Sequence, residues 1–343
     1  MYRMRDGQLR LASKRTRNMR HKRETHSLRY KDSCIAMSSN NNVTGTVAIL
    51  GGTGDIGFHI SRIFLTEYRK EFPVVRITTR DPSSPKAQQL ANLGAKLYKT
   101  SDSFDDVLSG VEVVVNALPT FISEDAKKEL LAAIVRAGPK VSFLSEFGDD
   151  WRQNDFEGYE HAEWGRKRVI LANTQAALRG TQTKIISVYT GNFAGWFFLP
   201  ALGIDIEKNV YSPLGPASLR IAVTHEDDIA RSVARLAILS LDPATASTVP
   251  NHVRISGQNV SYEEIRDAVA RVKGVPKGEI KSYDLDEYKK NLKANPSNFI
   301  MDFVRALIGE GKVDWSDSNA NELVNPGQSL WKWKTVEDFL RSQ

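Results

Sequence analysis

The chain of 343 residues has little of several features that would point to particular protein classes. It contains a single cysteine, Cys34, which excludes an internal disulfide and a cysteine-based metal cluster. No apolar run approaches the roughly 20 residues that a membrane-spanning helix needs. The spacing of the His, Asp and Glu residues does not indicate a metal site. We therefore expect a globular protein without a metal or a membrane anchor, located in the cytoplasm, where thiols stay reduced.

The positive charge of the chain is concentrated near its N-terminus. Residues 1–32 contain eleven Lys or Arg and three acidic residues, whereas the whole chain carries only +6. Because large apolar side chains are few there, we expect residues 1–42 to form a disordered basic tail. A nucleic-acid-binding arm and a mitochondrial transit segment formed by residues 1–36 are alternatives. We favour a flexible extension, with Met37 as the functional start, and expect no nucleic-acid partner.

A glycine turn at residues 51–57 is the most informative stretch of the sequence. An apolar run, Val47–Leu50, precedes the turn and an amphipathic helical pattern follows it. In a dinucleotide-binding unit the three glycines permit a tight turn, a close approach of N–H groups to a pyrophosphate, and close packing of the helix. A phosphate loop of the Gly-Lys-Ser/Thr type is excluded, because Phe58 and His59 follow the last glycine. The residues expected to contact the cofactor are Gly51, Thr53, Gly54, Asp55, Ile56 and Gly57.

Strand and helix patterns alternate from this turn to about residue 191. Strand patterns occur at residues 74–79, 95–98, 111–117, 141–144 and 185–189, and the runs at 74–79 and 111–117 are rich in β-branched residues. Helical patterns lie between them at residues 86–93, 102–109, 123–137 and 160–178. This alternation predicts an α/β fold with a doubly wound parallel sheet of the Rossmann type.

The alternation weakens after residue 191. Capping-box patterns that begin at Thr224 and Ser261 predict two helices, with a strand at residues 252–256 between them. Short helices are expected at residues 285–294, 297–308 and 335–341. We therefore expect residues 43–191 to form an NAD(P)-binding core. Residues 192–343 are expected to form a smaller, mixed substrate-binding region that is interleaved with this core.

Ligands of open parallel sheets bind beyond the carboxyl ends of the strands. Arg80 follows the second strand, where an arginine suits the 2′-phosphate of NADP and an acid would suit NAD. Lys86 adds a second positive charge, while Asp81 leaves the NAD alternative open. We expect NADP(H) as the cofactor. Further cofactor contacts are expected from residues that follow the fourth, fifth and sixth strands, namely Ala117, Leu118, Ser145, Phe147, Asn192 and Phe193.

Several segments, taken in order, carry a family resemblance. They are the glycine turn, the Arg80 loop, Leu144-Ser145-Glu146-Phe147-Gly148, the helix around Lys167, and Gly191-Asn192-Phe193-Ala194-Gly195-Trp196-Phe197. The chain resembles the NmrA-like and isoflavone reductase-like group of atypical short-chain dehydrogenases/reductases over roughly residues 45–342. That group includes the phenylcoumaran benzylic ether and pinoresinol–lariciresinol reductases. The resemblance implies an NADPH-dependent oxidoreductase that transfers hydride to a small aromatic or carbonyl-type substrate.

The resemblance also implies a catalytic residue. Reductases of this group carry a lysine on the helix after Ser-Glu-Phe-Gly, where it lies against the nicotinamide and acts as general acid/base. Lys167 is the nearest match, and the flanking Arg166 and Arg168 are poor general bases because arginine stays protonated. The Tyr-x-x-x-Lys pair of ordinary short-chain dehydrogenases is absent, since Glu163 stands four residues before Lys167.

Two questions stay open at this point. Phe147, Trp196 and Phe197 are expected to contact the substrate, but an ordinary aromatic core cluster is the alternative for the residues near 196. The second question is the kind of function. In NmrA-like regulators the same fold senses the redox state of the dinucleotide and controls a partner protein without turnover. The missing tyrosine permits that reading, and a homodimer is compatible with both.

Overall fold

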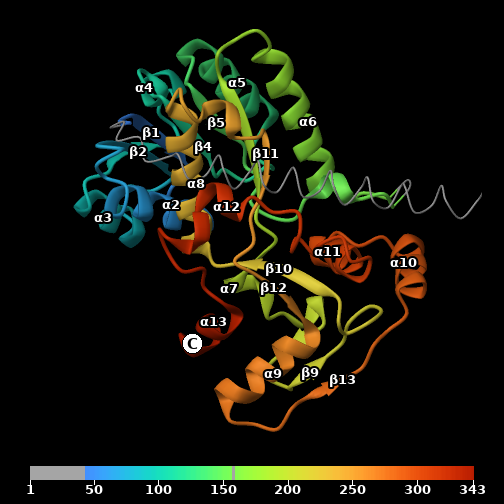
Figure 1. Ribbon diagram of the computed structural model, residues 1–343. Helices are drawn as coiled ribbons and strands as arrows, with labels where there is room; N and C mark the ends of the chain where they lie inside the picture. The colour runs from blue at the N-terminus through green and yellow to red at the C-terminus, as the bar shows by residue number, and fades with distance from the viewer. Residues whose placement is uncertain (1–42, 157–158) are drawn as a thin grey trace, which may run out of the picture. The chain divides into compact units, whose positions relative to one another are not determined.

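The computed structural model describes residues 43–156 and 159–343, so the predicted basic tail lies outside the described residues. Its largest sheet has seven strands, which are all parallel (Figure 1). The spatial order is β11-β6-β5-β4-β1-β2-β3. The order reverses between β1 and β4, which confirms the predicted doubly wound sheet and marks the place where such sheets bind ligands. The strands are β1 (Thr46–Leu50), β2 (Val74–Thr79), β3 (Lys96–Lys99), β4 (Val113–Asn116), β5 (Val141–Phe143), β6 (Lys184–Tyr189) and β11 (His252–Arg254).

Helices cover both faces of this sheet. One face carries α2 (Asp55–Thr66) and α8 (Glu226–Leu241), which pack against each other, and α3 (Pro85–Asn92) lies beside α2. The other face carries α4 (Phe104–Leu108), α5 (Glu124–Ala137) and α6 (Ala162–Ala177). Because both faces are covered, the strands are apolar on both sides, as the β-branched runs predicted.

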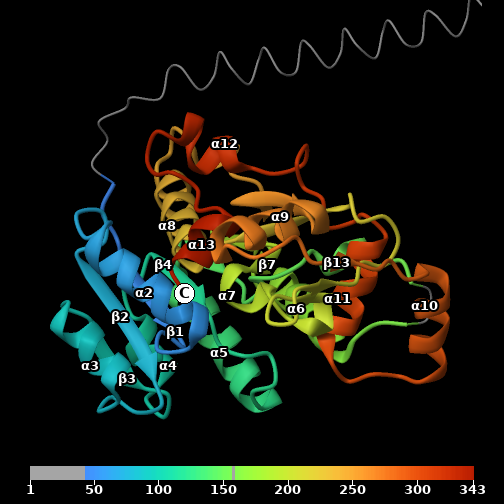
Figure 2. The same cartoon turned by 90° about the horizontal axis from the view of Figure 1, so that it is seen from below.

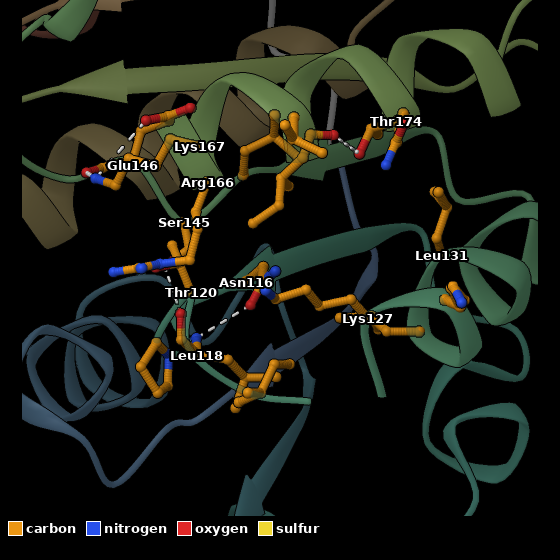
Figure 3. Close-up of a pocket in the computed structure, with 18 of the residues that line it drawn as sticks. Asn116, Leu118, Thr120, Lys127, Leu131, Ser145, Glu146, Arg166, Lys167 and Thr174 are labelled. Atoms are coloured by element: carbon orange, nitrogen blue, oxygen red, sulfur yellow. Dashed lines mark hydrogen bonds and ion pairs between the residues drawn. The ribbon is translucent and has the colours of Figure 1, made fainter. Parts of the chain in front are cut away.

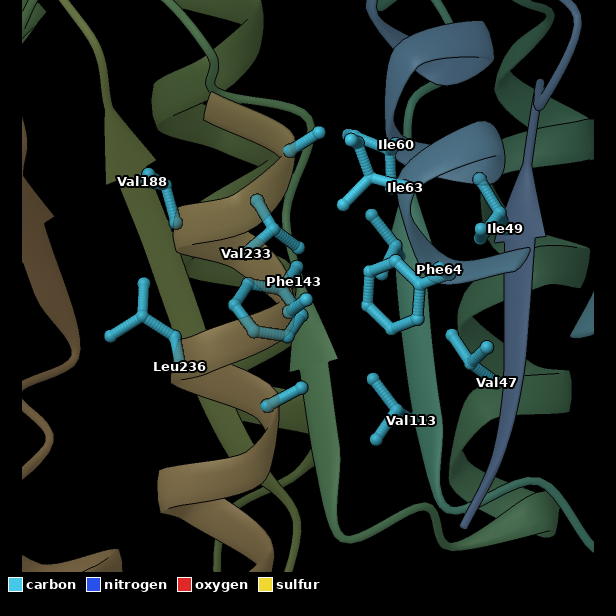
Figure 4. Packing of buried hydrophobic residues seen from close by; sticks show 14 of the residues in the cluster. Val47, Ile49, Ile60, Ile63, Phe64, Val113, Phe143, Val188, Val233 and Leu236 are labelled. Atoms are coloured by element: carbon cyan, nitrogen blue, oxygen red, sulfur yellow. The ribbon is translucent and has the colours of Figure 1, made fainter. Parts of the chain in front are cut away.

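The apolar residues of each strand divide between the two faces. In β1, Val47 and Ile49 belong to the cluster under α2 and α8, whereas Ala48 and Leu50 belong to the cluster under α4 and α5. This division follows from the two-residue period of a strand. Figure 4 shows the first cluster, where side chains of α2 and α8 meet above the strands. Its completely buried members include Ile60, Ile63, Phe64, Val113, Phe143, Val188, Val233 and Leu236.

The rest of the chain adds two small sheets and several short helices (Figure 2). One sheet has the order β12-β10-β7, from Gln258–Ser261, Arg220–Thr224 and Asn192–Phe193. The other has the order β13-β9-β8, from Glu279–Ile280, Val210–Tyr211 and Ile204–Asp205. The helices are α7 (Ala194–Phe197), α9 (Tyr262–Lys273), α10 (Leu285–Ala294), α11 (Ile300–Gly309), α12 (Asn321–Val324) and α13 (Val336–Arg341). Short 3-10 helices are η1 (Trp151–Gln153), η2 (Pro200–Leu202), η3 (Ala246–Thr248) and η4 (Pro326–Gln328).

Of the two predicted capping boxes, one is confirmed and one is wrong. Ser261 accepts from the Glu264 N–H, and the Glu264 carboxylate accepts from the Ser261 N–H. Thr224 is instead the last residue of β10, His225 is the N-cap, and α8 begins at Glu226. The His225 ring nitrogen Nδ1 accepts from the backbone N–H of Asp227 at 3.2 Å. The sequence pattern missed this cap because imidazole is a rarer N-cap than a hydroxyl.

The predicted boundary between the two regions lies between residues 191 and 192. Two elements that follow this boundary in the sequence still belong to the layers of the large sheet, namely α8, which covers one face, and β11, which pairs at its edge. The division into two functional regions stays a prediction.

Candidate active site

The glycine turn joins β1 to α2 at the point where the strand order reverses. Gly51 has a φ of +76°, and its N–H donates to Thr78 Oγ1 at the end of β2 over 2.8 Å. Gly54 closes the turn by donating to the Gly51 carbonyl over 2.9 Å. A Cβ on Gly57 would lie 2.2 Å from that same carbonyl oxygen, so helix and turn touch. Gly51 and Gly57 thus serve the turn and the packing, and Gly54 stays exposed toward solvent.

The first turn of α2 is open to an anion. Its N-cap is Gly54, which offers no side chain to bond the first N–H groups of the helix. Those groups and the helix dipole attract a phosphate. Asp55, in the first turn, accepts from Trp196 Nε1 at 2.7 Å, which links the glycine turn to α7. Ile56 is partly buried and packs against the core under α2 and α8.

The end of β2 favours Arg80 over Asp81 as the residue that recognises the ribose. Arg80 is exposed directly after β2. Asp81 Oδ1 instead accepts from the N–H and the hydroxyl of Ser83, at 2.8 and 2.6 Å. These two bonds hold the pKa of Asp81 below its usual value. The carboxylate is therefore engaged within its own loop, whereas the exposed Arg80 guanidinium forms no hydrogen bond or ion pair with another of the described residues.

Two more predicted contacts lie beside the turn. The hydroxyl of Thr53 bonds to the hydroxyl of Thr79, the last residue of β2, at 2.9 Å. The Lys86 ammonium lies 5.3 Å from the centre of the Phe58 ring on α2. Two positively charged side chains, Arg80 and Lys86, thus lie on the loop and the helix that follow β2.

The loops after β4, β5 and β6 are joined to one another by hydrogen bonds. Leu118 donates its N–H to Asn116 Oδ1 at 3.0 Å, and its carbonyl accepts from the Ser145 hydroxyl at 2.7 Å. Thr190, after β6, donates its N–H to the Gly148 carbonyl at 2.9 Å. Ala117 approaches the turn as well, because a Cβ on Gly51 would lie 2.9 Å from the Ala117 oxygen. The strand ends therefore form one continuous rim.

Lys167 reaches this rim from α6. Its ammonium donates to the backbone carbonyl of Glu146, directly after β5, and lies 3.7 Å from Glu146 Oε2 (Figure 3). The lysine side chain is only 14% exposed. Arg166 turns instead to Glu163 at 2.8 Å, and Arg168 forms its ion pair nearer the surface. Of the three consecutive cations, Lys167 is the one held at the end of β5.

Two acids, the buried Glu146 and the partly buried Asp149, lie near Lys167, and the sequence alone did not single them out. Glu146 is 3% exposed, and burial raises its pKa although Lys167 and the Trp151 N–H, at 2.9 Å, oppose the shift. Asp149 Oδ1 is buried and accepts no hydrogen bond from the described residues. Burial raises the pKa of Asp149 to about 7, against the attraction of Lys167.

Asp150 has the opposite surroundings. It is buried, and burial alone would raise its pKa, but Arg152 and Arg254 both bond its carboxylate at 2.7–2.8 Å. The net effect is a pKa below the usual value. Asp150 is therefore a structural anion, whereas Glu146 and Asp149 are the acids next to Lys167.

A cavity of about 460 Å³ opens beside Lys167 between α5 and α6 (Figure 3). It begins at the rim, where Asn116, Leu118, Ser145 and Lys167 line it, and continues along the sheet. Its volume lies within the range of about 300–1,000 Å³ that small-molecule sites show. The residues of the glycine turn do not line it, whereas Leu118, Ser145 and Lys167, which are expected to contact the cofactor, do.

The predicted aromatic contacts have different surroundings. Trp196 is 54% exposed and bonds Asp55. Phe197 is completely buried in the core of the small sheets, which favours the alternative of an ordinary core cluster for this residue. Phe147 is 9% exposed and belongs to the core under α2 and α8, which leaves little of its ring for a ligand. Asn192 and Phe193 form β7, and Asn192 Nδ2 is buried without a partner among the described residues.

Comparison with known protein families identifies the family of this chain. The model of the NmrA-like family matches residues 43–340. The chain belongs to the NmrA-like family. Its curated relatives include the phenylcoumaran benzylic ether reductase PT1 of Pinus taeda, 25% identical over 64% of this chain and 72% of the relative. Eugenol synthase 2 of Clarkia breweri is 32% identical over 46% of this chain and 51% of the relative. The predicted family resemblance is confirmed.

Solved structures agree on the fold. A crystal structure of isoflavone reductase has a TM-score of 0.67 at 19% identity, covering 88% of this chain and 99% of the other. AtPrR2 with NADP+ and (+)pinoresinol has a TM-score of 0.66 at 21% identity, covering 87% and 98%. Within the described residues, no helix combines the length and the apolar character needed to cross a bilayer. The same residues contain no cluster of His, Cys, Asp and Glu able to hold a metal ion.

Proposed function

We propose that this chain is an NADPH-dependent reductase that transfers hydride to a small aromatic or carbonyl-type molecule, with Lys167 as general acid/base. At the level of class, an NADP(H)-dependent oxidoreductase is supported by the NmrA-like family match and by the reductase names of the relatives. The observation that carries the finer proposal is the position of Lys167. Its ammonium is held in the loop after β5, and β5 is the neighbour of β4 at the strand-order reversal where the dinucleotide of such sheets lies.

The residues of the turn fit NADP(H). Gly54 leaves the first N–H groups of α2 open for the pyrophosphate, and a Cβ there would stand in the approach to them. Arg80 and Lys86 supply positive charge for the 2′-phosphate. When bound, NADPH supplies the hydride.

Lys167 supplies the proton. An ammonium has three N–H donors. One is used on the Glu146 carbonyl, which fixes the direction of the side chain, and the Glu146 carboxylate at 3.7 Å balances the charge. The remaining donors can bond the oxygen on which negative charge develops as hydride arrives. Glu146 therefore positions Lys167, and Trp151 in turn holds Glu146.

The proposed substrate class is supported by the relatives. Phenylcoumaran benzylic ether reductase and the pinoresinol complex of AtPrR2 both concern aromatic molecules with several oxygens. In this chain the cavity beside Lys167 has apolar walls, which suits aromatic rings.

Replacing Lys167 with methionine tests the proposal. The full chain is assayed for NADPH oxidation with pinoresinol, aromatic enones and quinones as acceptors. We expect Lys167→Met to lower kcat by about 10²–10⁴-fold, the range for loss of a general acid, while NADPH affinity stays close to the starting value. Arg168→Met is the matched control, since that side chain is 52% exposed and pairs with Glu160. Unchanged turnover in Lys167→Met would show that the assigned role is wrong.

The redox-sensor alternative stays a prediction. A sensor must bind the oxidised and the reduced cofactor with different affinities, because a ligand with equal affinity for two states shifts no population. Titration with NADPH and with NADP+ therefore separates the two functions. Equal affinities combined with Lys167-dependent turnover identify an enzyme.

A further inference from the structure

An aspartate stands in the first turn of α2, where the proposed cofactor site has to receive an anion. Asp55 is the first residue of this helix, directly after Gly54, and it is exposed. A carboxylate at this position is itself attracted by the free N–H groups and by the positive end of the helix dipole. It therefore competes with the pyrophosphate of a dinucleotide for the same N–H groups and adds like-charge repulsion. The site can bind a dinucleotide well only if this carboxylate is kept away from the first turn.

The carboxylate of Asp55 is bonded elsewhere. Within the described residues its one hydrogen-bond partner is the indole of Trp196, whose Nε1 donates to Asp55 Oδ2 at 2.7 Å. The N-cap residue Gly54 has no side chain that could bond the same helix start. The first N–H groups of α2 therefore have no side-chain acceptor, although an acid lies directly beside them.

The helix α7 holds Trp196 in a fixed place. Its neighbours Ala194 and Phe197 are buried, and the Gly195 N–H donates to Glu226 Oε1, in the first turn of α8, at 2.9 Å. A Cβ on Gly195 would lie 2.8 Å from that oxygen, so a glycine lets α7 approach the carboxylate. The indole of Trp196 is 54% exposed, so its clearest directed contact is the hydrogen bond to Asp55. A well-anchored segment thus presents an N–H group to an exposed acid at the cofactor site.

We propose that Trp196 is a positioning residue for the dinucleotide, because its indole N–H holds the Asp55 carboxylate away from the N–H groups that receive the pyrophosphate. This role rests on the proposed cofactor site at the glycine turn, and it differs from the substrate contact that the sequence predicts for Trp196. Without the indole N–H, the carboxylate is released to bond the first turn of α2 itself, and the dinucleotide binds more weakly. NADPH and NADH share the pyrophosphate, so both are weakened by the same factor.

Calorimetric titration of the full chain with NADPH tests this role. Trp196→Phe keeps an aromatic ring and loses the N–H, and we expect it to raise the Kd for NADPH by roughly three- to tenfold. Asp55→Asn removes the competing charge and should lower this Kd by roughly two- to fivefold. When Asp55→Asn is already present, adding Trp196→Phe should change the Kd by less than about twofold, because the two residues act through one contact.

Two controls accompany the titration. Asp125→Asn is the matched charge control, since Asp125 also lies in the first turn of a helix, α5, and its side chain is 97% exposed; it should leave the Kd unchanged. NADH is the second probe, and Trp196→Phe should weaken it by the same factor as NADPH, unlike a change at the 2′-phosphate. Thermal unfolding without cofactor shows whether each variant is folded.

Two outcomes overturn the positioning role alone. The first is an equal loss of NADPH affinity from Trp196→Phe with and without Asp55→Asn, which would mean that the ring acts on the cofactor or on the fold and not through the carboxylate. The second is unchanged affinity in Trp196→Phe while the parent chain binds NADPH. A failure of the proposed cofactor site looks different, because the parent chain would then bind neither NADPH nor NADH, and the positioning role would fall with it.

Discussion

Replacing Asp149 with asparagine should remove a pH-dependent loss of stability from this protein. Asp149 lies three residues after Glu146, and its Oδ1 atom is buried without a hydrogen-bond partner among the described residues. Burial raises its pKa from 3.8 to about 7, because the ionised form loses its water, and the nearby Asp150 adds to the shift. The attraction of Lys167 opposes the shift and does not cancel it. Asparagine has nearly the shape of the neutral acid and cannot ionise.

The sign and the size follow from proton linkage. Below pH 3.8 the carboxyl is protonated in both the folded and the unfolded chain, so it has no effect on the pH dependence. Above that value the unfolded chain releases the proton first, and the free energy of unfolding falls as the pH rises toward about 7. Above about 7 the loss is constant. Between pH 5 and pH 8 the expected loss is about 2.5 kcal/mol, on the scale of about 1.4 kcal/mol per pKa unit.

Urea denaturation of both proteins at pH 5 and pH 8, followed by tryptophan fluorescence, measures this difference. Asp149→Asn should gain stability relative to the parent chain on going from pH 5 to pH 8. Asp125→Asn on α5 is the control, because the Asp125 side chain is 97% exposed. If Asp149→Asn and the parent chain show the same change in unfolding free energy over this range, burial does not raise the pKa of Asp149 as reasoned.

Three further predictions concern the turn, the cofactor and the core. Gly57→Ala places a methyl group 2.2 Å from the Gly51 oxygen and should cost about 1–3 kcal/mol in thermal unfolding without cofactor. In Gly54→Ala the Cβ would lie 3.1 Å from the same oxygen, so this variant should unfold near the parent temperature and yet bind NADPH weakly. If the two variants lost the same thermal stability and the same NADPH affinity, the separate roles of Gly54 and Gly57 would be contradicted. Arg80→Ser should weaken NADPH by roughly 10–100-fold in calorimetry and leave NADH unchanged, and an equal effect on both would exclude 2′-phosphate recognition. Phe64→Ala removes a completely buried ring and should cost about 3–5 kcal/mol in urea denaturation; a loss below 1 kcal/mol would mean that the core relaxes around the gap.

Much of the large sheet could be predicted because its signals are local. The runs at residues 74–79 and 185–189 appear as β2 (Val74–Thr79) and β6 (Lys184–Tyr189), since β-branched strands between helices leave a clear pattern. The strand predicted at residues 252–256 appears as β11 (His252–Arg254), but its place at the edge of the large sheet depends on pairing with β6, which no local pattern encodes. Strands of two residues, such as β7 and β8, are too short to show any period.

At the candidate site, too, some features follow from the local sequence and others do not. Glycines, Arg80 and Lys167 were predicted because their residue type limits their chemistry. The roles of Glu146 and Asp149 depend on burial, which follows from how η1 and α6 pack over the end of β5 and is invisible in the sequence. For Phe197 the sequence left two roles open, because an aromatic residue near a site can pack in the core or contact a ligand, and its burial favours the core.

The position of α8 and β11 late in the sequence has a consequence for folding during translation. During synthesis, β6 leaves the ribosome more than sixty residues before its neighbour β11, and the face of the sheet under α8 stays uncovered until residues 226–241 follow. The dinucleotide-binding half therefore cannot finish folding while it is being translated, and a nascent chain stopped near residue 200 exposes an unpaired strand edge. Residues of the second half thus complete the sheet and the core of the first half, and we expect the two halves to fold and unfold as one unit.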